Sequence, residues 1–215
     1  MPLVIIPARL KSERLPNKPL QKIGGDPLIV HCWRRAMEAD IGPVWVACDS
    51  DDIVEAIERR GGKALITGEA RCGTDRVALA AGIADPPKHH AQIVNQQGDM
   101  PFLNPDHLRI FARGMERMAE MATAYADLKL VTIAGADFNR QTVRSHIGLY
   151  GFTREGLDRF HLLGPSVREE EERLEQLRAV GVLAIEFIEL PYMPMEVNTA
   201  EDLMAANQLF ALPRA

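Results

Sequence analysis

The fold is decided by the stretch LVIIPARLKSERLPNKPL, residues 3–20. Its first five residues are apolar and end at Pro7, a pattern typical of a short buried strand. The loop that follows carries the cations Arg9, Arg14 and Lys18, besides Lys11, between prolines that limit its flexibility. In parallel α/β sheets, ligands bind beyond the carboxyl ends of the strands, so this basic loop is a candidate anion site. A solvated surface loop is the other interpretation that composition leaves open.

The same order of strand, loop and helix repeats along the first half of the chain. Strands are predicted at 44–48, 64–66 and 92–95, and helices at 27–39, 53–60, 74–83 and from 104 to about 118. This alternation predicts an α/β fold, with a doubly wound, mostly parallel sheet and helices on both faces. The second half is less regular. It favours strands at 124–128, 130–133, 147–152 and 184–190, a helix at 167–180 and a last helix from Thr199.

Composition excludes several classes of function. The chain has 215 residues and a net charge of −5, which is unsuited to nucleic-acid binding by the molecule as a whole. No stretch approaches the roughly 18 apolar residues of a membrane span, and the apolar N-terminus is too short for a signal sequence. We therefore expect a cytoplasmic protein. Cys32, Cys48 and Cys72 are too few and too scattered for a disulfide framework or a zinc site.

Two further loops follow predicted strands or begin predicted helices. Gln97-Gly98-Asp99 comes after the strand at 92–95, where a carboxylate can hold Mg²⁺ or serve only as a turn residue. Gly73-Thr74-Asp75 begins a helix, where free backbone N–H groups can bind a base or phosphate, or Cys72 and its neighbours can act only as a cap.

Together these loops resemble the 3-deoxy-manno-octulosonate cytidylyltransferase family, the CMP-KDO synthetases. The resemblance rests on Pro-Ala-Arg-x-x-Ser-x-Arg-Leu-Pro-x-Lys-Pro-Leu at 7–20, Gly-Thr-Asp-Arg at 73–76 and Gln-Gly-Asp at 97–99. Residues 146–152, 174–178 and 197–203 are similar to the family's sugar-site strand, sugar-site helix and closing motif. The resemblance covers most of the chain. It implies a nucleotide-diphospho-sugar transferase-like (Rossmann-like) fold in one domain, 1–215, with a nucleotide-binding part at about 1–120, a small inserted lobe at about 121–195 and a C-terminal helix at 199–210.

The resemblance also implies a reaction. CTP and an acidic keto-sugar, KDO or a relative, would give a CMP-sugar and pyrophosphate, mostly by positioning and charge neutralisation. The catalytic residues would be Arg9, Lys18 and Asp99. The nucleotide would be bound by Pro7, Ala8, Arg9, Arg14, Lys18, Cys72, Gly73, Thr74, Gln97 and Asp99. The sugar would be bound by His146, Tyr150, Glu175 and Gln176, and Mg²⁺ by Asp99 and Asn198. Two alternative interpretations remain open: Tyr150 serves in packing alone, and Glu175 is a solvated helix carboxylate.

The chain departs from the family pattern at several positions. Asn198 stands where the family has an aspartate that helps bind metal, and the loss of that charge should weaken Mg²⁺ binding unless another acid compensates. Met100 replaces a glutamate, and Cys72 replaces a serine. The stretch between Asp127 and Ser145 is shorter, and it lacks the family's arginine-bearing segment associated with the sugar carboxylate. Arg140 or Arg144 is a candidate substitute.

Three hypotheses follow. The leading one is a cytidylyltransferase that activates KDO or a related acidic sugar for lipopolysaccharide or capsule synthesis. The second is a cytidylyltransferase for a different sugar, and the third is a non-catalytic paralogue that binds nucleotide or a partner protein. The resemblance also implies a homodimer formed largely through the smaller lobe.

Overall fold

The core of the protein is a seven-stranded sheet with the strand order β5-β4-β1-β6-β8-β7-β9. The computed structural model describes residues 1–127 and 144–212. The strands are β1 (Leu3–Pro7), β4 (Val44–Cys48), β5 (Lys63–Ile66), β6 (Gln92–Gln96), β7 (Met121–Asp127), β8 (Arg144–Thr153) and β9 (Ile185–Glu189). β8 runs antiparallel to both of its neighbours, and the other adjacent pairs are parallel. The predicted α/β fold with a mostly parallel sheet is confirmed.

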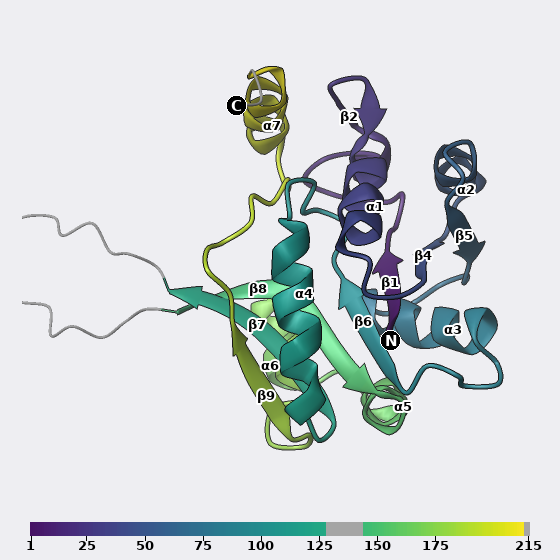
Figure 1. The fold of residues 1–215 in the computed structure, drawn as a ribbon, viewed down its shortest axis with the longest axis vertical. Helices are drawn as coiled ribbons and strands as arrows, with labels where there is room; N and C mark the ends of the chain where they lie inside the picture. The colour runs from purple at the N-terminus through teal and green to yellow at the C-terminus, as the bar shows by residue number, and fades with distance from the viewer. Residues whose placement is uncertain (128–143, 213–215) are drawn as a thin grey trace, which may run out of the picture.

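β1 lies inside the sheet and is buried on both faces, which explains its unbroken apolar sequence. Val4 and Ile6 pack on one face against α1 (Leu28–Ala39), α2 (Asp51–Glu58) and α4 (Pro105–Gly114). Leu3 and Ile5 pack on the other face against α3 (Gly73–Ala84) and α5 (Arg154–Leu162). The protein therefore has helices on both faces of the sheet (Figure 1).

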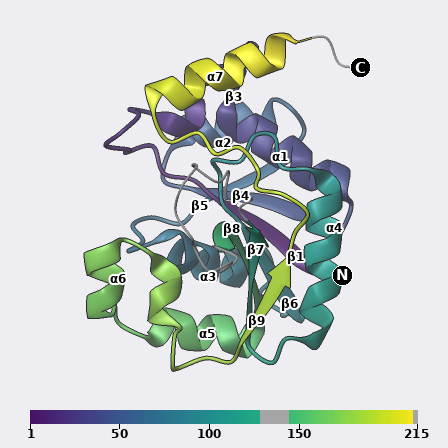
Figure 2. The same cartoon turned by 90° about the vertical axis from the view of Figure 1, so that its left-hand side faces the viewer.

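The C-terminal helix α7 (Ala200–Ala211) covers the N-terminal end of α1 (Figure 2). It packs on a small hairpin of β2 (Lys22–Ile23) and β3 (Asp26–Pro27) that follows the basic loop and its 3₁₀ turn η1 (Lys18–Leu20). Gly24 at the hairpin tip has φ +55°, and a Cβ there would lie 1.9 Å from the Phe210 ring. α7 is thus packed beside the loop that carries the predicted anion site.

The second half differs from its prediction in two places. The predicted helix at 167–180 is wrong: α6 (Val167–Glu172) ends at Arg173, which has φ +55°, and a separate 3₁₀ helix η3 (Glu175–Arg178) follows. α5 was missed altogether. The strand predicted at 130–133 lies outside the described residues. β7, β8 and β9 extend the same sheet, and the lobe boundaries at about 121 and 195 stay a prediction. Within the described ranges, no helix is long and apolar enough to cross a bilayer.

His107 on α4 is a buried group with no evident structural need for its polarity. Its ring packs against Tyr192, and neither ring nitrogen has a hydrogen-bond partner among the described residues. Burial lowers the pKa of His107 below its ordinary value of 6.5, so the unfolded chain takes up this proton at a higher pH than the folded protein. Stability is therefore lost as pH falls through 6.5.

We expect His107→Phe to raise the free energy of unfolding by about 1 kcal/mol at pH 7.5, because two buried unpaired nitrogens are removed. The gain over the wild type should grow as pH falls to 5.5. Urea unfolding of both proteins at both pH values measures this difference in the free energy of unfolding. The same difference at pH 7.5 and pH 5.5 would contradict the assigned proton linkage.

Candidate active site

The basic loop lies at the carboxyl end of β1, held there by contacts on both sides. The backbone N–H of Leu10 donates to Asp49 Oδ1 at 2.8 Å, and Leu15 is buried against α1 and α7. Arg9 and Arg14 are exposed, whereas Lys18 is largely covered, with its side chain 18% accessible. The loop therefore presents two exposed guanidinium groups and one largely covered ammonium group.

Lys18 joins two segments that are far apart in the sequence. Its Nζ lies 3.0 Å from Asp99 Oδ2 and 2.9 Å from Asn198 Oδ1. Arg14 reaches the same Asn198 oxygen at 3.4 Å. The proximity of Lys18 and Asp99 follows from topology, because β1 and β6 are parallel neighbours and their carboxyl ends meet. Gly98 allows this approach, since a Cβ there would lie 2.9 Å from the Pro7 carbonyl oxygen.

One carboxylate at this cluster was missed by sequence reasoning. Asn198 Nδ2 donates to Glu196 Oε2 at 3.3 Å. Burial raises the pKa of Glu196, and the neighbouring charge of Asp99 raises it further, whereas Lys18 and Arg14 lower it. Glu196 immediately precedes the closing motif at 197–203, and that position is the sequence signal that could have found it.

The start of α3 is the second predicted nucleotide contact. Cys72 caps the helix, with its Sγ accepting from the Asp75 N–H at 3.4 Å, and burial raises the pKa of this thiol. Thr74 is buried, and its hydroxyl accepts a hydrogen bond from Asn95 Nδ2 at 2.9 Å. Its side chain therefore fixes α3 to β6, which leaves backbone and Cys72 atoms as the groups that can face a base.

The four predicted sugar residues gather beside α3. Glu175 accepts from the Thr74 N–H at 3.0 Å and from Gln97 Nε2 at 2.9 Å, so it is not a solvated helix carboxylate. Burial raises its pKa. Tyr150, whose pKa burial also raises, donates its hydroxyl proton to Gln176 Oε1 at 3.1 Å. These contacts place η3 against both the α3 start and the Gln97 loop.

His146 belongs to the same group of side chains. Its ring lies 5.5 Å from the Tyr150 ring, and Nε2 is hydrogen-bonded to Thr123 Oγ1 at 2.9 Å. Burial lowers the pKa of His146, so the ring is neutral at pH 7. Of the two candidate carboxylate-binding arginines, Arg144 is exposed at the start of β8 and lies over the Tyr125 ring, and Arg140 falls outside the described residues.

Behind these residues lies a buried ionic network that the sequence did not reveal. Arg178 is 3% exposed and contacts both oxygens of Asp75 at 3.2 Å and Glu169 at 2.6 Å. Burial alone would raise the pKa of Asp75, but Arg71, His161 and Arg178 together hold it below its ordinary value. The network ties α6 and η3 to the first turn of α3.

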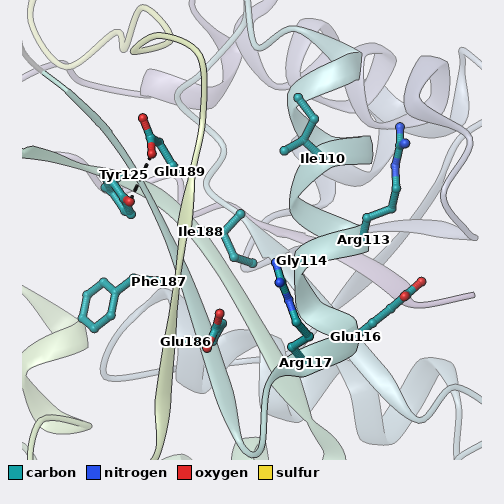
Figure 3. A pocket seen from close by; sticks show the side chains of 10 residues that line it. All are labelled: Ile110, Arg113, Gly114, Glu116, Arg117, Tyr125, Glu186, Phe187, Ile188 and Glu189. Carbon is teal, nitrogen blue, oxygen red and sulfur yellow. Dashed lines mark hydrogen bonds between the residues drawn. The ribbon is translucent and has the colours of Figure 1, made fainter.

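Of two hollows on the described surface, one adjoins the basic loop. One, of about 600 Å³, is lined by Leu10, Lys11, Asn17, Asp49, Gly68 and Glu69, at the carboxyl ends of β1, β4 and β5. The other, of about 610 Å³, lies between α4 and the edge strand β9 (Figure 3), and neither hollow is lined by a predicted site residue. The first adjoins the basic loop and is where the fold favours a ligand.

Comparisons with known proteins agree with this geometry. A family model described as cytidylyltransferase matches residues 3–134. A 3-deoxy-manno-octulosonate cytidylyltransferase of Methylobacterium nodulans is 39% identical, with 99% of this chain and 98% of that protein covered. The chain belongs to the cytidylyltransferase family. A relative of the same name in Rhodospirillum rubrum is 40% identical over 97% of this cytidylyltransferase and 95% of its own length.

A solved structure extends the likeness to three dimensions. A CMP:2-keto-3-deoxy-manno-octonic acid synthetase complexed with CTP is 28% identical to this cytidylyltransferase, has a TM-score of 0.85 and is matched over 99% of its chain. The alignment to the Methylobacterium relative runs over 245 positions, more than the 215 residues here, so the relative carries positions that this cytidylyltransferase lacks. The predicted shortening between Asp127 and Ser145 falls mostly on residues 128–143, outside the described ranges.

Proposed function

We propose that this protein is a 3-deoxy-manno-octulosonate cytidylyltransferase, which activates KDO with CTP for lipopolysaccharide synthesis in the cytoplasm. The observation that carries the proposal is the convergence of Lys18, Asp99 and Asn198 at the carboxyl ends of β1 and β6. It is supported by full-length relatives of that name at 39% identity.

The reaction asks the protein to position two anionic substrates and to balance charge. The anomeric hydroxyl of KDO forms a bond to the α-phosphorus, the bond between the α- and β-phosphates breaks, and the hydroxyl proton is released. Negative charge accumulates on the departing pyrophosphate. Arg9 and Arg14 are exposed cations able to meet the phosphates, and Lys18 is already fixed beside Asp99. Such pre-arranged cations stabilise the transition state because they need no reorganisation when charge develops.

We propose that the bound metal ion is Mg²⁺, and the residues present fit this ion. Asp99 and Asn198 direct one oxygen each at a common cation, here the Lys18 ammonium. Magnesium prefers one or two carboxylates completed by phosphate and water. No group of three or more His, Cys, Asp or Glu able to hold a metal occurs in the described parts of the chain. Bound Mg²⁺ would neutralise phosphate charge.

The sugar side is assigned to the group around Tyr150. Glu175 and Gln176 lie on η3, and His146 lies on the same strand as Tyr150. Glu175 contacts the Thr74 N–H at the α3 start. Gln176 and His146 contact Tyr150, so the group lies where an acceptor sugar would approach the nucleotide. Arg144 lies on β8 with His146 and Tyr150, and it is our candidate for binding the sugar carboxylate. Its guanidinium lies over the Tyr125 ring.

The proposal is tested by measuring pyrophosphate release from CTP in the presence of Mg²⁺. The acceptors are a panel of 2-keto-3-deoxy sugar acids, with neutral sugars for comparison. We expect release with KDO and little with neutral sugars. Release with another acid alone would favour the different-sugar alternative, and silence from folded protein across the panel would contradict the proposal.

We further propose that the enzyme is a homodimer formed through its smaller lobe. β9 is the last strand of the sheet, and Phe187 on it is 63% exposed beside the hollow in Figure 3. Exposed edge strands with apolar side chains favour pairing with another chain.

Phe187→Asp should therefore convert a dimer to a monomer in sedimentation velocity at micromolar concentration. Met204, also 63% exposed but on α7, gives the matched control Met204→Asp, which should stay dimeric. A wild type that sediments as a monomer would refute the dimer.

A further inference from the structure

The segment before α7 lies directly beside Asp99. The Val197 N–H donates to the Asp99 carbonyl oxygen at 2.9 Å. The Val197 side chain is fully buried in the cluster that joins α1 and α7. Its two neighbours are only partly buried, and their side chains contact each other, with Asn198 Nδ2 3.3 Å from Glu196 Oε2. Glu196 and Asn198 therefore share one side of this segment.

The orientation of the Asn198 amide is determined at both ends. Its oxygen accepts from the Lys18 ammonium at 2.9 Å, and its nitrogen donates to the Glu196 carboxylate. Lys18 can only donate and a carboxylate only accept, so the amide cannot be reversed without losing both contacts. Asn198 thus directs a neutral oxygen toward the Asp99 cluster while Glu196 stands beside it.

The charge of the cluster depends on Glu196. Asn198 contributes no charge, and the Asp202 carboxylate accepts from the backbone N–H groups of Asn198 and Thr199 at the α7 cap. Without Glu196, Asp99 would therefore be the carboxylate left beside Lys18. Glu196 interacts electrostatically with Asp99, Lys18 and Arg14. A site with Asp99 as its only carboxylate and two cations nearby would hold a divalent metal poorly, whereas two carboxylates with nucleotide phosphates suit Mg²⁺.

We propose that Glu196 is a metal-binding residue of this enzyme and supplies, two positions earlier in the chain, the carboxylate that Asn198 lacks. The inference rests on the proposed function. It assigns Asp99 and Glu196 as the two carboxylates of the nucleotide-bound metal site, with Asn198 as a neutral oxygen donor.

The test measures metal binding without turnover. Mn²⁺ serves as the probe, and free Mn²⁺ is followed by electron paramagnetic resonance with the full chain and CTP, in the absence of KDO. Glu196→Gln keeps an oxygen that can accept from Asn198 Nδ2 and removes only the charge. We expect it to weaken Mn²⁺ binding by roughly tenfold or more. The matched control is Glu201→Gln, an exposed carboxylate in the first turn of α7, which should change binding little.

A relocation variant makes the test specific. Glu196→Gln combined with Asn198→Asp returns one carboxylate to the same side of the segment, and it should restore most of the lost Mn²⁺ affinity. Thermal melting without metal shows that each variant is folded.

Binding by Glu196→Gln equal to that of the wild type, or no recovery in the double variant, would overturn the metal role. Failure of the proposed function has a different signature, because the wild type itself would then bind neither CTP nor Mn²⁺ in its presence.

Discussion

Replacing Lys18 by methionine is expected to lower kcat/KM for cytidylyl transfer by roughly 10³-fold, within the range seen when one pre-arranged donor to developing charge is removed. The side chain is largely covered, and its ammonium is held by Asp99 and Asn198 at the meeting point of β1 and β6. Methionine keeps the length of the stem and removes the charge, so the change isolates electrostatics from packing.

The control for this variant is Lys22→Met, an exposed lysine on β2 a few residues along the chain. It should keep activity within about twofold, because exposed charges away from the site contribute little. Steady-state kinetics on both variants, with melting curves to show that they are folded, decides the question. A Lys18→Met enzyme within tenfold of the wild type would remove Lys18 from the catalytic machinery.

The second large effect is on stability. Arg178→Met should lower the free energy of unfolding by about 3–5 kcal/mol, because it leaves buried carboxylates without their main counter-charge. Arg178 is 3% exposed and contacts Asp75 and Glu169. Asp75 keeps Arg71 and His161, whereas Glu169 loses both of its Arg178 contacts. The variant should also bind the sugar poorly, since η3 carries Glu175 and Gln176.

Arg168→Met is the matched control for stability. Arg168 is on α6, close to the same network, but its side chain is 66% exposed and its ion pair with Glu172 is long, at 3.8 Å. Its loss should cost about 0.5 kcal/mol or less. Urea unfolding curves for the pair give the comparison, and equal losses from the two changes would show that the buried network is not what holds α6 and η3 in place.

The buried network around Arg178 also explains why the helix predicted at 167–180 is wrong. Leu174, Leu177 and Val180 have helical spacing, so the pattern at 167–180 predicts one helix. In a continuous helix, residues nine apart are about 13 Å apart along the axis. Glu169 and Arg178 are nine apart and in direct contact at 2.6 Å, so the chain must turn back between them, and it does so at Arg173.

The first half was predictable because its signals are local. β1 and β4 were predicted with the bounds that the structure has, since each is an apolar run buried on both faces. Lys18 and Asp99 were singled out for the same reason, because each lies in a loop that follows a strand, and their roles in the site stay a prediction. Glu196 and Arg178 were missed because their interactions with Asp99 and Asp75 join residues about a hundred positions apart in the sequence. Met100, a departure from the family's glutamate, is fully buried in the core, where a carboxylate would be costly.

Product formation decides whether the nucleotide site and a KDO-accepting sugar site are both present in this protein. Purified protein with CTP, KDO and Mg²⁺ should yield CMP-KDO, identified by mass, in equal amount to pyrophosphate. We expect this product with the wild type and its near absence with Lys18→Met. Protein that binds CTP, remains folded and forms no CMP-KDO would contradict the proposed function.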